Sequence, residues 1–259
     1  MSLDLKGRTV LVTGASSGIG AACAEVFADA GCRLVLAARR LDRLEVMAQR
    51  LRREHDSEVL VGTLDVRDRL AVDAWVEGLD PAWSDIDVLV NNAGLARGLS
   101  TIHEGDINDW EEMIDTNVKG LLWVTRAVLR GMVARGSGHV VNIGSIAGHE
   151  TYPGGNVYCA SKHAVTAIGR ALNIDVLGTG VRVSSVDPGL VKTEFSEVRF
   201  HGDRRRADAV YYGLEPLSGR DVADAVFFCA TRPPHANVRE MILMPSAQAA
   251  AVHAHRSRS

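Results

Sequence analysis

This chain of 259 residues has few cysteines, a small net charge and no long apolar run. The four cysteines lie in or beside apolar segments without the spacing of metal ligands, so we expect reduced thiols and no metal site: Cys23, Cys32, Cys159 and Cys229. A formal net charge of −3 gives no sign of a nucleic-acid partner. The longest purely apolar runs fall far short of the roughly 20 residues that cross a bilayer. We therefore expect no membrane span, no secretory leader and a cytoplasmic location.

The chain does contain a regular alternation of predicted strands and helices. Strands are predicted at 8–13, 33–38, 59–64, 87–90, 139–143, 181–187 and 240–243. Helices are predicted at 18–30, 41–54, 68–78, 109–135, 156–178 and 219–230, the last with a capping box formed by Ser218 and Asp221. Such alternation indicates parallel strands with right-handed crossovers, and hence one doubly wound α/β domain of Rossmann type. We assign this domain to residues 1–248 and expect residues 249–259 to form a flexible tail.

Tyr158 and Lys162 indicate a proton-transfer chemistry. They are four residues apart in a predicted helix, so both side chains lie on one face of it. A tyrosine ordinarily keeps its proton until about pH 10. A fixed ammonium beside it favours the phenolate, lowers that pKa, and lets the phenol act as an acid and base at working pH.

A glycine-rich turn lies near the start of the chain. The predicted strand at 8–13 is followed by Gly14-Ala-Ser-Ser-Gly18-Ile-Gly20 and then by an alanine-rich helical segment. A strand, a glycine-rich turn and a helix in this order form a cradle for a pyrophosphate, because backbone N–H groups and the helix dipole face it. The alternative is an ordinary tight turn between a strand and a helix.

The end of the second predicted strand indicates which dinucleotide is bound. NAD-binding chains usually carry an acidic residue there to hold the ribose 2′-hydroxyl. Ala38 takes that place here and Arg39 follows, with Arg40 as a supporting charge. A guanidinium suits a 2′-phosphate in charge and in geometry, so Arg39 predicts selectivity for NADP. The alternative is a pair of solvated arginines at a helix start.

The motifs occur together in a fixed order: Thr13-Gly14-x-x-x-Gly18-x-Gly20, Asn91-Asn92-Ala93-Gly94, Asn117, Ser145, Tyr158-x-x-x-Lys162 and Pro188-Gly189. In this order and spacing the chain resembles the short-chain dehydrogenase/reductase family from about Lys6 to about Gln248. The resemblance implies about seven strands in the order 3-2-1-4-5-6-7, the cofactor NADP(H), and hydride exchange between an alcohol and a carbonyl.

The resemblance also implies a role for each motif residue. Tyr158 would be the acid and base, Ser145 would bind the substrate oxygen, Lys162 would tune Tyr158 and hold the nicotinamide ribose, and Asn117 would carry a water. The cofactor residues implied are Gly14, Ser16, Ser17, Gly18, Ile19, Gly20, Arg39, Arg40, Asp65, Val66, Asn91, Ala93, Gly94, Tyr158, Lys162, Pro188, Gly189, Val191 and Thr193.

Two segments resemble a narrower branch, the bacterial NADP-dependent 3-hydroxy acid dehydrogenases, which act on serine, allo-threonine, 3-hydroxypropionate and malonic semialdehyde. They are Gly154–Tyr158 and the run from Val186 to Asp203, and the C-terminal segments Val238-Arg-Glu240 and Met244-Pro245-x-x-x-Gln248 fit the same branch. A carboxylate substrate needs a nearby cation, and Arg199 is a candidate, with a salt bridge within a lid as its alternative. Arg97 departs from the apolar residue expected in its loop and could bind an acid or face solvent. Ala147 and Gly155 complete the candidate substrate residues.

Other functions stay open at this point. They are a broad carbonyl reductase of neutral ketones and aldehydes, a non-redox isomerase, and an NADP-sensing protein.

Apolar residues cover more than one stripe of the predicted helices 109–135 and 156–178. Because one face of each helix must pack on the sheet, a second face needs another partner, and we expect a homotetramer, with a dimer as the alternative.

Overall fold

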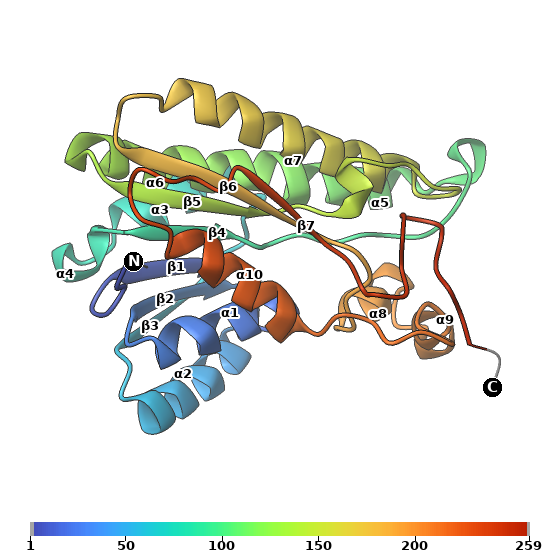
Figure 1. Cartoon of the computed structure of the whole chain (residues 1–259), viewed down its shortest axis with the longest axis horizontal. Coiled ribbons are helices and arrows are strands. Elements are labelled where there is room, and N and C mark those ends of the chain that lie inside the picture. The colour runs from blue at the N-terminus through green and yellow to red at the C-terminus, as the bar shows by residue number, and fades with distance from the viewer. Residues whose placement is uncertain (1–2, 258–259) are drawn as a thin grey trace.

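A computed structural model describes residues 3–257, in which seven strands form one sheet (Figure 1). The strands are β1 (Thr9–Thr13), β2 (Arg33–Ala38), β3 (Val59–Thr63), β4 (Val88–Asn91), β5 (Gly138–Ile143), β6 (Val181–Pro188) and β7 (Glu240–Leu243). Their order is β3-β2-β1-β4-β5-β6-β7 and every neighbouring pair is parallel. The predicted fold class and strand order are therefore confirmed.

Helices cover both faces of the sheet (Figure 1). The α-helices are α1 (Gly18–Asp29), α2 (Leu41–His55), α3 (Arg69–Glu77), α4 (Pro81–Ser84), α5 (Ile107–Ile114), α6 (Leu121–Arg135), α7 (Asn156–Asp175), α8 (Phe195–Arg199), α9 (Arg204–Ala209) and α10 (Gly219–Ala230). Two short 3₁₀ turns are η1 (Ile102–Glu104) and η3 (Ile146–Gly148). The predicted capping box of Ser218 and Asp221 starts α10.

Alternating side chains of the strands feed two separate cores. Val10 of β1 and Leu34 of β2 pack with α1, α2 and α10 on one face. Leu11 and Val35, one residue further along, pack with α3, α6 and α7 on the other face. Successive side chains of a strand point to opposite faces, so a strand covered on both sides is apolar throughout. This explains why β1 is buried at every position.

The predicted helix 109–135 is wrong in detail. Asp106 caps α5 by accepting a hydrogen bond from the Asn108 N–H at 2.8 Å, and a π-helical segment η2 (Asp115–Gly120) separates α5 from α6. A Cβ on Gly120 would lie 2.6 Å from a methyl of Val66, so the wider turn lets this backbone approach the segment after β3. Hydrophobic periodicity carries no sign of that contact. The predicted helix 156–178 also ends earlier, at Asp175.

The segment between β6 and α10 forms the helices α8 and α9, which the strand-and-helix pattern did not predict. The chain end lies beside them in Figure 1. The Ser257 N–H donates to the Gly213 carbonyl at 2.8 Å, and the Ala251 N–H donates to the Glu150 carboxylate at 2.8 Å. The tail predicted at 249–259 thus makes contacts up to residue 257, its flexibility stays a prediction, and residues 258–259 lie outside the described part. Within residues 3–257, no helix is long and apolar enough to cross a membrane.

Candidate active site

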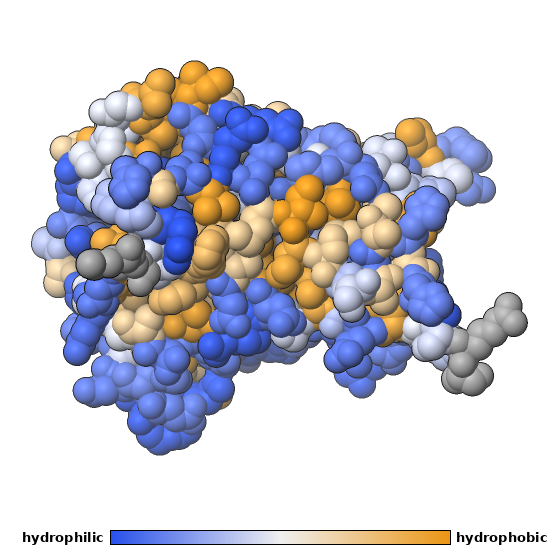
Figure 2. Space-filling view, in the orientation of Figure 1, coloured by the Kyte–Doolittle hydropathy of each residue, from blue (hydrophilic) through white to orange (hydrophobic). Residues whose placement is uncertain are grey.

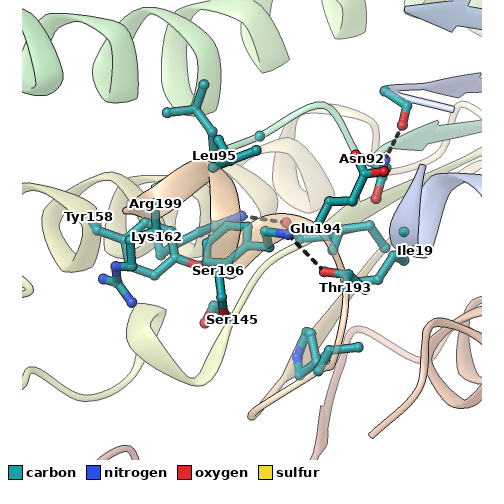
Figure 3. Close-up of a pocket in the computed structure, with 18 of the residues that line it drawn as sticks. Ile19, Asn92, Leu95, Ser145, Tyr158, Lys162, Thr193, Glu194, Ser196 and Arg199 are labelled. Carbon is teal, nitrogen blue, oxygen red and sulfur yellow. Dashed lines mark hydrogen bonds between the residues drawn. The ribbon is translucent and has the colours of Figure 1, made fainter. Parts of the chain in front are cut away.

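A cavity of about 630 Å³ opens at the carboxyl ends of the strands. This edge of a doubly wound sheet is where ligands bind, because the loops that follow neighbouring strands diverge there. In Figure 3, Ser145, Tyr158, Lys162 and Arg199 gather toward one end of the cavity, and Ile19 and Asn92 lie toward the other. The predicted cofactor residues on its wall are Gly14, Ser16, Ser17, Gly18, Ile19, Arg39, Arg40, Asp65, Val66, Ala93, Gly94, Tyr158, Lys162, Pro188, Gly189, Val191 and Thr193.

The turn between β1 and α1 requires glycine. Gly14 has φ of +63°, and a Cβ there would lie 2.9 Å from the Ala93 Cα. Gly18, the first residue of α1, has φ of +57°, and a Cβ there would lie 3.2 Å from the Thr193 Cβ. The first turn of α1 carries no acidic residue. An unobstructed helix N-terminus at the cavity wall suits an anionic ligand.

Gly20 and Asn91 do not line the cavity, although both were predicted to contact the cofactor. A Cβ on Gly20 would lie 2.4 Å from the Asn92 side chain, so this glycine packs α1 against the loop after β4. The Asn91 amide donates to Thr125 Oγ1 at 2.8 Å and to Asn142 Oδ1 at 3.0 Å inside the sheet. These contacts agree with the part of the prediction in which Asn91 holds the central sheet.

The two arginines after β2 have different surroundings. Arg40 donates to Ser16 Oγ at 3.2 Å, to Ser17 Oγ at 2.7 Å and to the Glu194 carboxylate at 2.9 Å. Arg39 forms one ion pair within residues 3–257, with Glu112 at 3.7 Å, and its side chain is 54% exposed. Arg40 therefore braces the glycine-rich turn, whereas Arg39 is free to turn toward a ligand.

Ser145, Tyr158 and Lys162 converge at the other end of the cavity. Ser145 precedes η3 and its Oγ accepts a hydrogen bond from the Ala147 N–H at 3.1 Å. Tyr158 and Lys162 are one turn apart on α7, and each is 7% exposed. The Lys162 ammonium donates to the Ile143 carbonyl at 2.9 Å, at the end of β5.

Burial controls the pKa values of this pair. Burial raises the pKa of Tyr158 above its ordinary value, as does the neighbouring Tyr152, while hydrogen bonding with Ser145 and the charge of Arg199 act in the opposite direction. Burial therefore has the largest effect on the pKa of Tyr158, and the predicted lowering by Lys162 stays a prediction. Burial lowers the pKa of Lys162 itself to about 8.

Asn117 lies in the π-helical segment η2 and does not line the cavity. Its amide donates to the Leu95 carbonyl at 2.8 Å and to Ser161 Oγ at 3.0 Å, and its Oδ1 accepts from the Leu95 N–H at 2.8 Å. A Cβ on Gly94 would lie 3.2 Å from Asn117 Oδ1 and 3.8 Å from the Lys162 Nζ. Asn117 and the lysine thus approach the same glycine, and the predicted water contact stays a prediction.

Of the candidate substrate residues, only Arg199 lines the cavity. The Arg199 guanidinium lies 5.2 Å from the centre of the Tyr158 ring and donates to the Tyr152 hydroxyl at 2.5 Å. Arg97 donates instead to Glu112 at 2.7 Å and to the Val198 carbonyl at 2.6 Å, so it ties α8 to α5. The expectation that Arg97 binds substrate is not supported by this placement.

Ala147 and Gly155 act through packing. Ala147 is buried in the small core around Tyr158. A Cβ on Gly155 would lie 2.2 Å from the Tyr152 ring, so this glycine makes room for the ring. Neither residue borders the cavity. Residues that the sequence reasoning missed do line it, including Tyr152, Glu194, Phe195, Gln248 and Val252. Tyr152 lies in the loop before α7, and the positions of the others depend on how the segment after β6 and the chain end fold back, for which the local sequence gives no signal.

Known proteins share this arrangement. The family described as short chain dehydrogenase matches residues 8–203. The NADP-dependent 3-hydroxy acid dehydrogenase YdfG of Salmonella typhi is 47% identical over 250 residues, which cover 96% of this chain and 99% of that protein. Sulfoacetaldehyde reductase 2 of Chromohalobacter salexigens is 46% identical over 241 residues, which cover 93% of this chain and 95% of that protein. Among solved structures, the closed form of serine dehydrogenase complexed with NADP+ superimposes with a TM-score of 0.90 at 44% identity, covering 96% of this chain and all of that one. The resemblance predicted from the motifs is thereby confirmed, and the chain belongs to the short-chain dehydrogenase family.

Proposed function

We propose that the protein is an NADP(H)-dependent oxidoreductase that interconverts an alcohol and a carbonyl in a 3-hydroxy acid such as serine, allo-threonine or 3-hydroxypropionate, the last giving malonic semialdehyde. The observation that carries this proposal is the Arg199 guanidinium, held 5.2 Å from the centre of the Tyr158 ring in the cavity. The names of the relatives, which include a 3-hydroxy acid dehydrogenase, support the same substrate class.

The residues of the cavity fit a phosphorylated dinucleotide. Gly14 and Gly18 leave the N-terminus of α1 open to a pyrophosphate, and Arg39 and Arg40 would hold the 2′-phosphate. Thr116 Oγ1 lines the same cavity and is buried without a hydrogen-bond partner among the described residues, so a polar ligand group would satisfy it. The bound cofactor supplies or accepts the hydride, and the relatives that are named for NADP support this choice.

We assign the proton step to Tyr158. The phenol would donate its proton to the carbonyl oxygen during reduction, or remove the hydroxyl proton during oxidation. Ser145 would hold that oxygen by a hydrogen bond. Burial raises the pKa of Tyr158 more than the charge of Arg199 lowers it. The tyrosine is therefore protonated at rest, which suits the reductive direction. The Lys162 ammonium would donate to the cofactor ribose, and Asn117 would support it near Gly94.

Arg199 would bind the acid group of the substrate. Its guanidinium lies between the two tyrosine rings, 5.2 Å from the centre of Tyr158 and 5.5 Å from that of Tyr152. A carboxylate that pairs with this cation holds the hydroxyl-bearing carbon within reach of the Tyr158 oxygen, because only one carbon separates the two groups in a 3-hydroxy acid. A buried or stacked guanidinium binds a planar carboxylate better than an ammonium does.

A second candidate is a broad carbonyl reductase of neutral ketones and aldehydes. The apolar wall of the cavity favours it, since Leu95, Phe195 and Val198 face the same space as Arg199. A pairwise assay separates the two candidates: 3-hydroxypropionate against its methyl ester, each with NADP+ and NAD+, followed at 340 nm. We expect the acid to be the better substrate. Equal or better turnover of the ester would favour the neutral-carbonyl candidate.

Two variants test the roles of single residues in the same assay. Arg199→Gln is expected to raise KM for the acid at least tenfold and to leave KM for the ester nearly unchanged. Tyr158→Phe is expected to abolish turnover of both substrates while cofactor binding persists. An absence of any absorbance change in the parent protein, over the full substrate panel, would favour an isomerase or a sensor instead.

We also propose a homotetramer in the cytoplasm. The exposed apolar residues include two separate pairs, one at the C-terminal end of α7 (Ile174 and Leu177) and one on α10 and β7 (Phe228 and Ile242). In Figure 2 apolar surface gathers over β7 and α10 near the centre of the view. Two distinct apolar faces support four subunits rather than two, and the free, buried cysteines suit a reducing compartment. Light scattering of the purified protein distinguishes a tetramer from a dimer.

A further inference from the structure

A buried carboxylate that has no part in the reaction described above lies behind the site. Asp187, near the end of β6, is fully buried. One of its oxygens accepts a hydrogen bond from the Ser185 hydroxyl at 2.5 Å, and the other lies 2.8 Å from His149 Nε2. A buried charge is costly unless it is hydrogen-bonded and has a counter-charge. With a neutral imidazole at His149, the two hydrogen bonds orient Asp187 without neutralising its charge.

Lys162 brings a positive charge toward the same segment. Its ammonium donates to the Ile143 carbonyl at 2.9 Å. A Cβ on the next residue, Gly144, would lie 1.8 Å from Asp187 Oδ1, so the carboxylate packs directly against this glycine. Cation and anion are thus packed against consecutive residues at the end of β5. Both are buried, so solvent screens their attraction little.

The remaining charges around this pair lie farther out. Arg170, two turns after Lys162 on α7, donates to the Glu240 carboxylate of β7 at 2.7 Å. The hydrogen bond and charge of Arg170, together with the charge of Arg239, lower the pKa of the Glu240 carboxyl. Asp187 also contributes to raising the pKa of Arg170, but that guanidinium is half exposed and already paired with Glu240.

We propose that Asp187, oriented by Ser185 and His149, is a positioning residue that keeps the Lys162 ammonium charged in the buried site. The inference rests on the proposed function, in which the charged lysine would hold the cofactor ribose. The opposing effects of burial and of Asp187 on the pKa of Lys162 agree with it, because burial lowers that pKa to about 8 and Asp187 acts to raise it.

The charge state of Lys162 can be measured without turnover. The chain has only four lysines, which are Lys6, Lys119, Lys162 and Lys192, so protein labelled at the lysine Cε carbon gives few NMR signals to assign. Asp187→Asn is expected to lower the pKa of Lys162 by about one unit, the size of effect of a nearby opposite charge. Asp175→Asn, at the exposed C-terminal end of the same helix, is the control and should leave it unchanged. An unchanged Lys162 titration in Asp187→Asn would overturn the proposal.

His149 gives a second route that leaves the buried carboxylate in place. The His149 side chain is 17% exposed. The substitution His149→Arg can add a permanent positive charge beside Asp187 while part of the longer side chain reaches solvent. This cation neutralises the carboxylate and is expected to lower the pKa of Lys162 in the same direction as Asp187→Asn. His149→Gln keeps a hydrogen-bond donor without the charge and should have no such effect. Equal titration of Lys162 in the Arg and Gln variants would contradict the proposal, even if Asp187→Asn failed to fold.

Activity then tests the consequence. If the pKa of Lys162 falls from about 8 to about 7, its charged fraction at pH 8 falls from about one half to about one tenth, a loss of about fivefold. We expect kcat of Asp187→Asn to fall by this factor at pH 8 and to recover most of it at pH 6.5, with KM little changed. A loss of kcat that is equal at both pH values would indicate a purely structural role and reject the proposal. Because the NMR titration needs no substrate, a wrong choice of substrate class leaves its result intact.

Discussion

The Glu194 carboxylate accepts a hydrogen bond from Arg40 at 2.9 Å, joining the segment after β6 to the segment after β2 across the mouth of the cavity. Its second oxygen accepts from Arg43 at 2.7 Å. Arg40 simultaneously donates to Ser16 and Ser17 of the glycine-rich turn. If Arg40 binds the ribose 2′-phosphate as proposed, the Glu194 carboxylate and the phosphate would compete for the same guanidinium, and cofactor binding would be linked to the position of α8.

Removing that carboxylate is expected to strengthen binding of the phosphorylated cofactor. In Glu194→Gln, Arg40 and Arg43 lose their shared anionic partner, because the glutamine side chain is neutral. The two ion pairs are about two-fifths exposed, so their combined worth is on the order of 1 kcal/mol. We expect NADP+ to bind roughly fivefold tighter and NAD+ to bind as before, as measured by isothermal titration. Glu197→Gln, one helical turn away, is the control, and equal effects of the two variants would reject a specific role for Glu194.

Arg39 and Arg40 are expected to have separable effects on cofactor choice. Arg39 has little to hold it in place, so Arg39→Ala should cost NADP+ affinity alone, and Arg39→Asp should shift the preference toward NAD+ by about 100-fold or more. Arg40 also braces Ser16 and Ser17, so Arg40→Ala should weaken both cofactors. The ratio of kcat/KM for the two cofactors measures this. An unchanged ratio in Arg39→Asp would leave Arg39 as a solvated residue.

The sequence predicted the fold well because the signals for it are local. The first strands of the sheet are short apolar runs, and the glycines at 14 and 18 lie where a turn with positive φ is needed. Since the carboxyl ends of parallel strands share one edge, residues that directly follow the strands had to meet there. Tyr158 and Lys162 were placed in the same site by their helical spacing and by the family resemblance.

The sequence could not predict features that depend on contacts between distant segments. The π-helical turn around Asn117 depends on Gly120 packing against Val66, far away in the chain. Which arginine faces the cavity depends on how α8 docks on the loop after β4, where Arg97 donates to the carbonyl of Val198 and Arg199 donates to that of Gly98. Burial raises the pKa of Tyr158, and the spacing of Tyr158 and Lys162 alone could not reveal that burial.

Arg97 is expected to matter through the position of α8. Its side chain is 19% exposed and joins Glu112 of α5 to the Val198 carbonyl of α8. In Arg97→Gln, α8 loses this anchor, so KM for the acid should rise several-fold while kcat changes little. Limited proteolysis between residues 190 and 217 should become faster. Arg220→Gln on the exposed start of α10 is the control, and equal proteolysis of both variants would show that Arg97 does not hold the segment.

The His139 imidazole is expected to make the fold acid-sensitive. It is buried in β5 with its Nε2 2.8 Å from the Ser184 hydroxyl, and its Nδ1 has no hydrogen-bond partner within the described residues. Burial lowers the pKa of His139 from 6.5 to about 3. Between these values the unfolded chain binds a proton that the folded chain does not, so the free energy of unfolding falls as the pH drops. At pH 5 the loss amounts to roughly 2 kcal/mol relative to pH 7.5.

Urea unfolding of a His139→Gln variant tests this assignment. The glutamine amide can keep the contact with Ser184 and does not titrate, so the variant is expected to lose little stability between pH 7.5 and pH 5, whatever its stability at pH 7.5. This pH range lies above the ordinary pKa values of carboxyl groups, near 4, so aspartate and glutamate contribute little to the difference. His103→Gln removes an exposed histidine from η1 and should keep the pH dependence of the parent protein. If His139→Gln retains that dependence as well, a different group is responsible for the acid sensitivity.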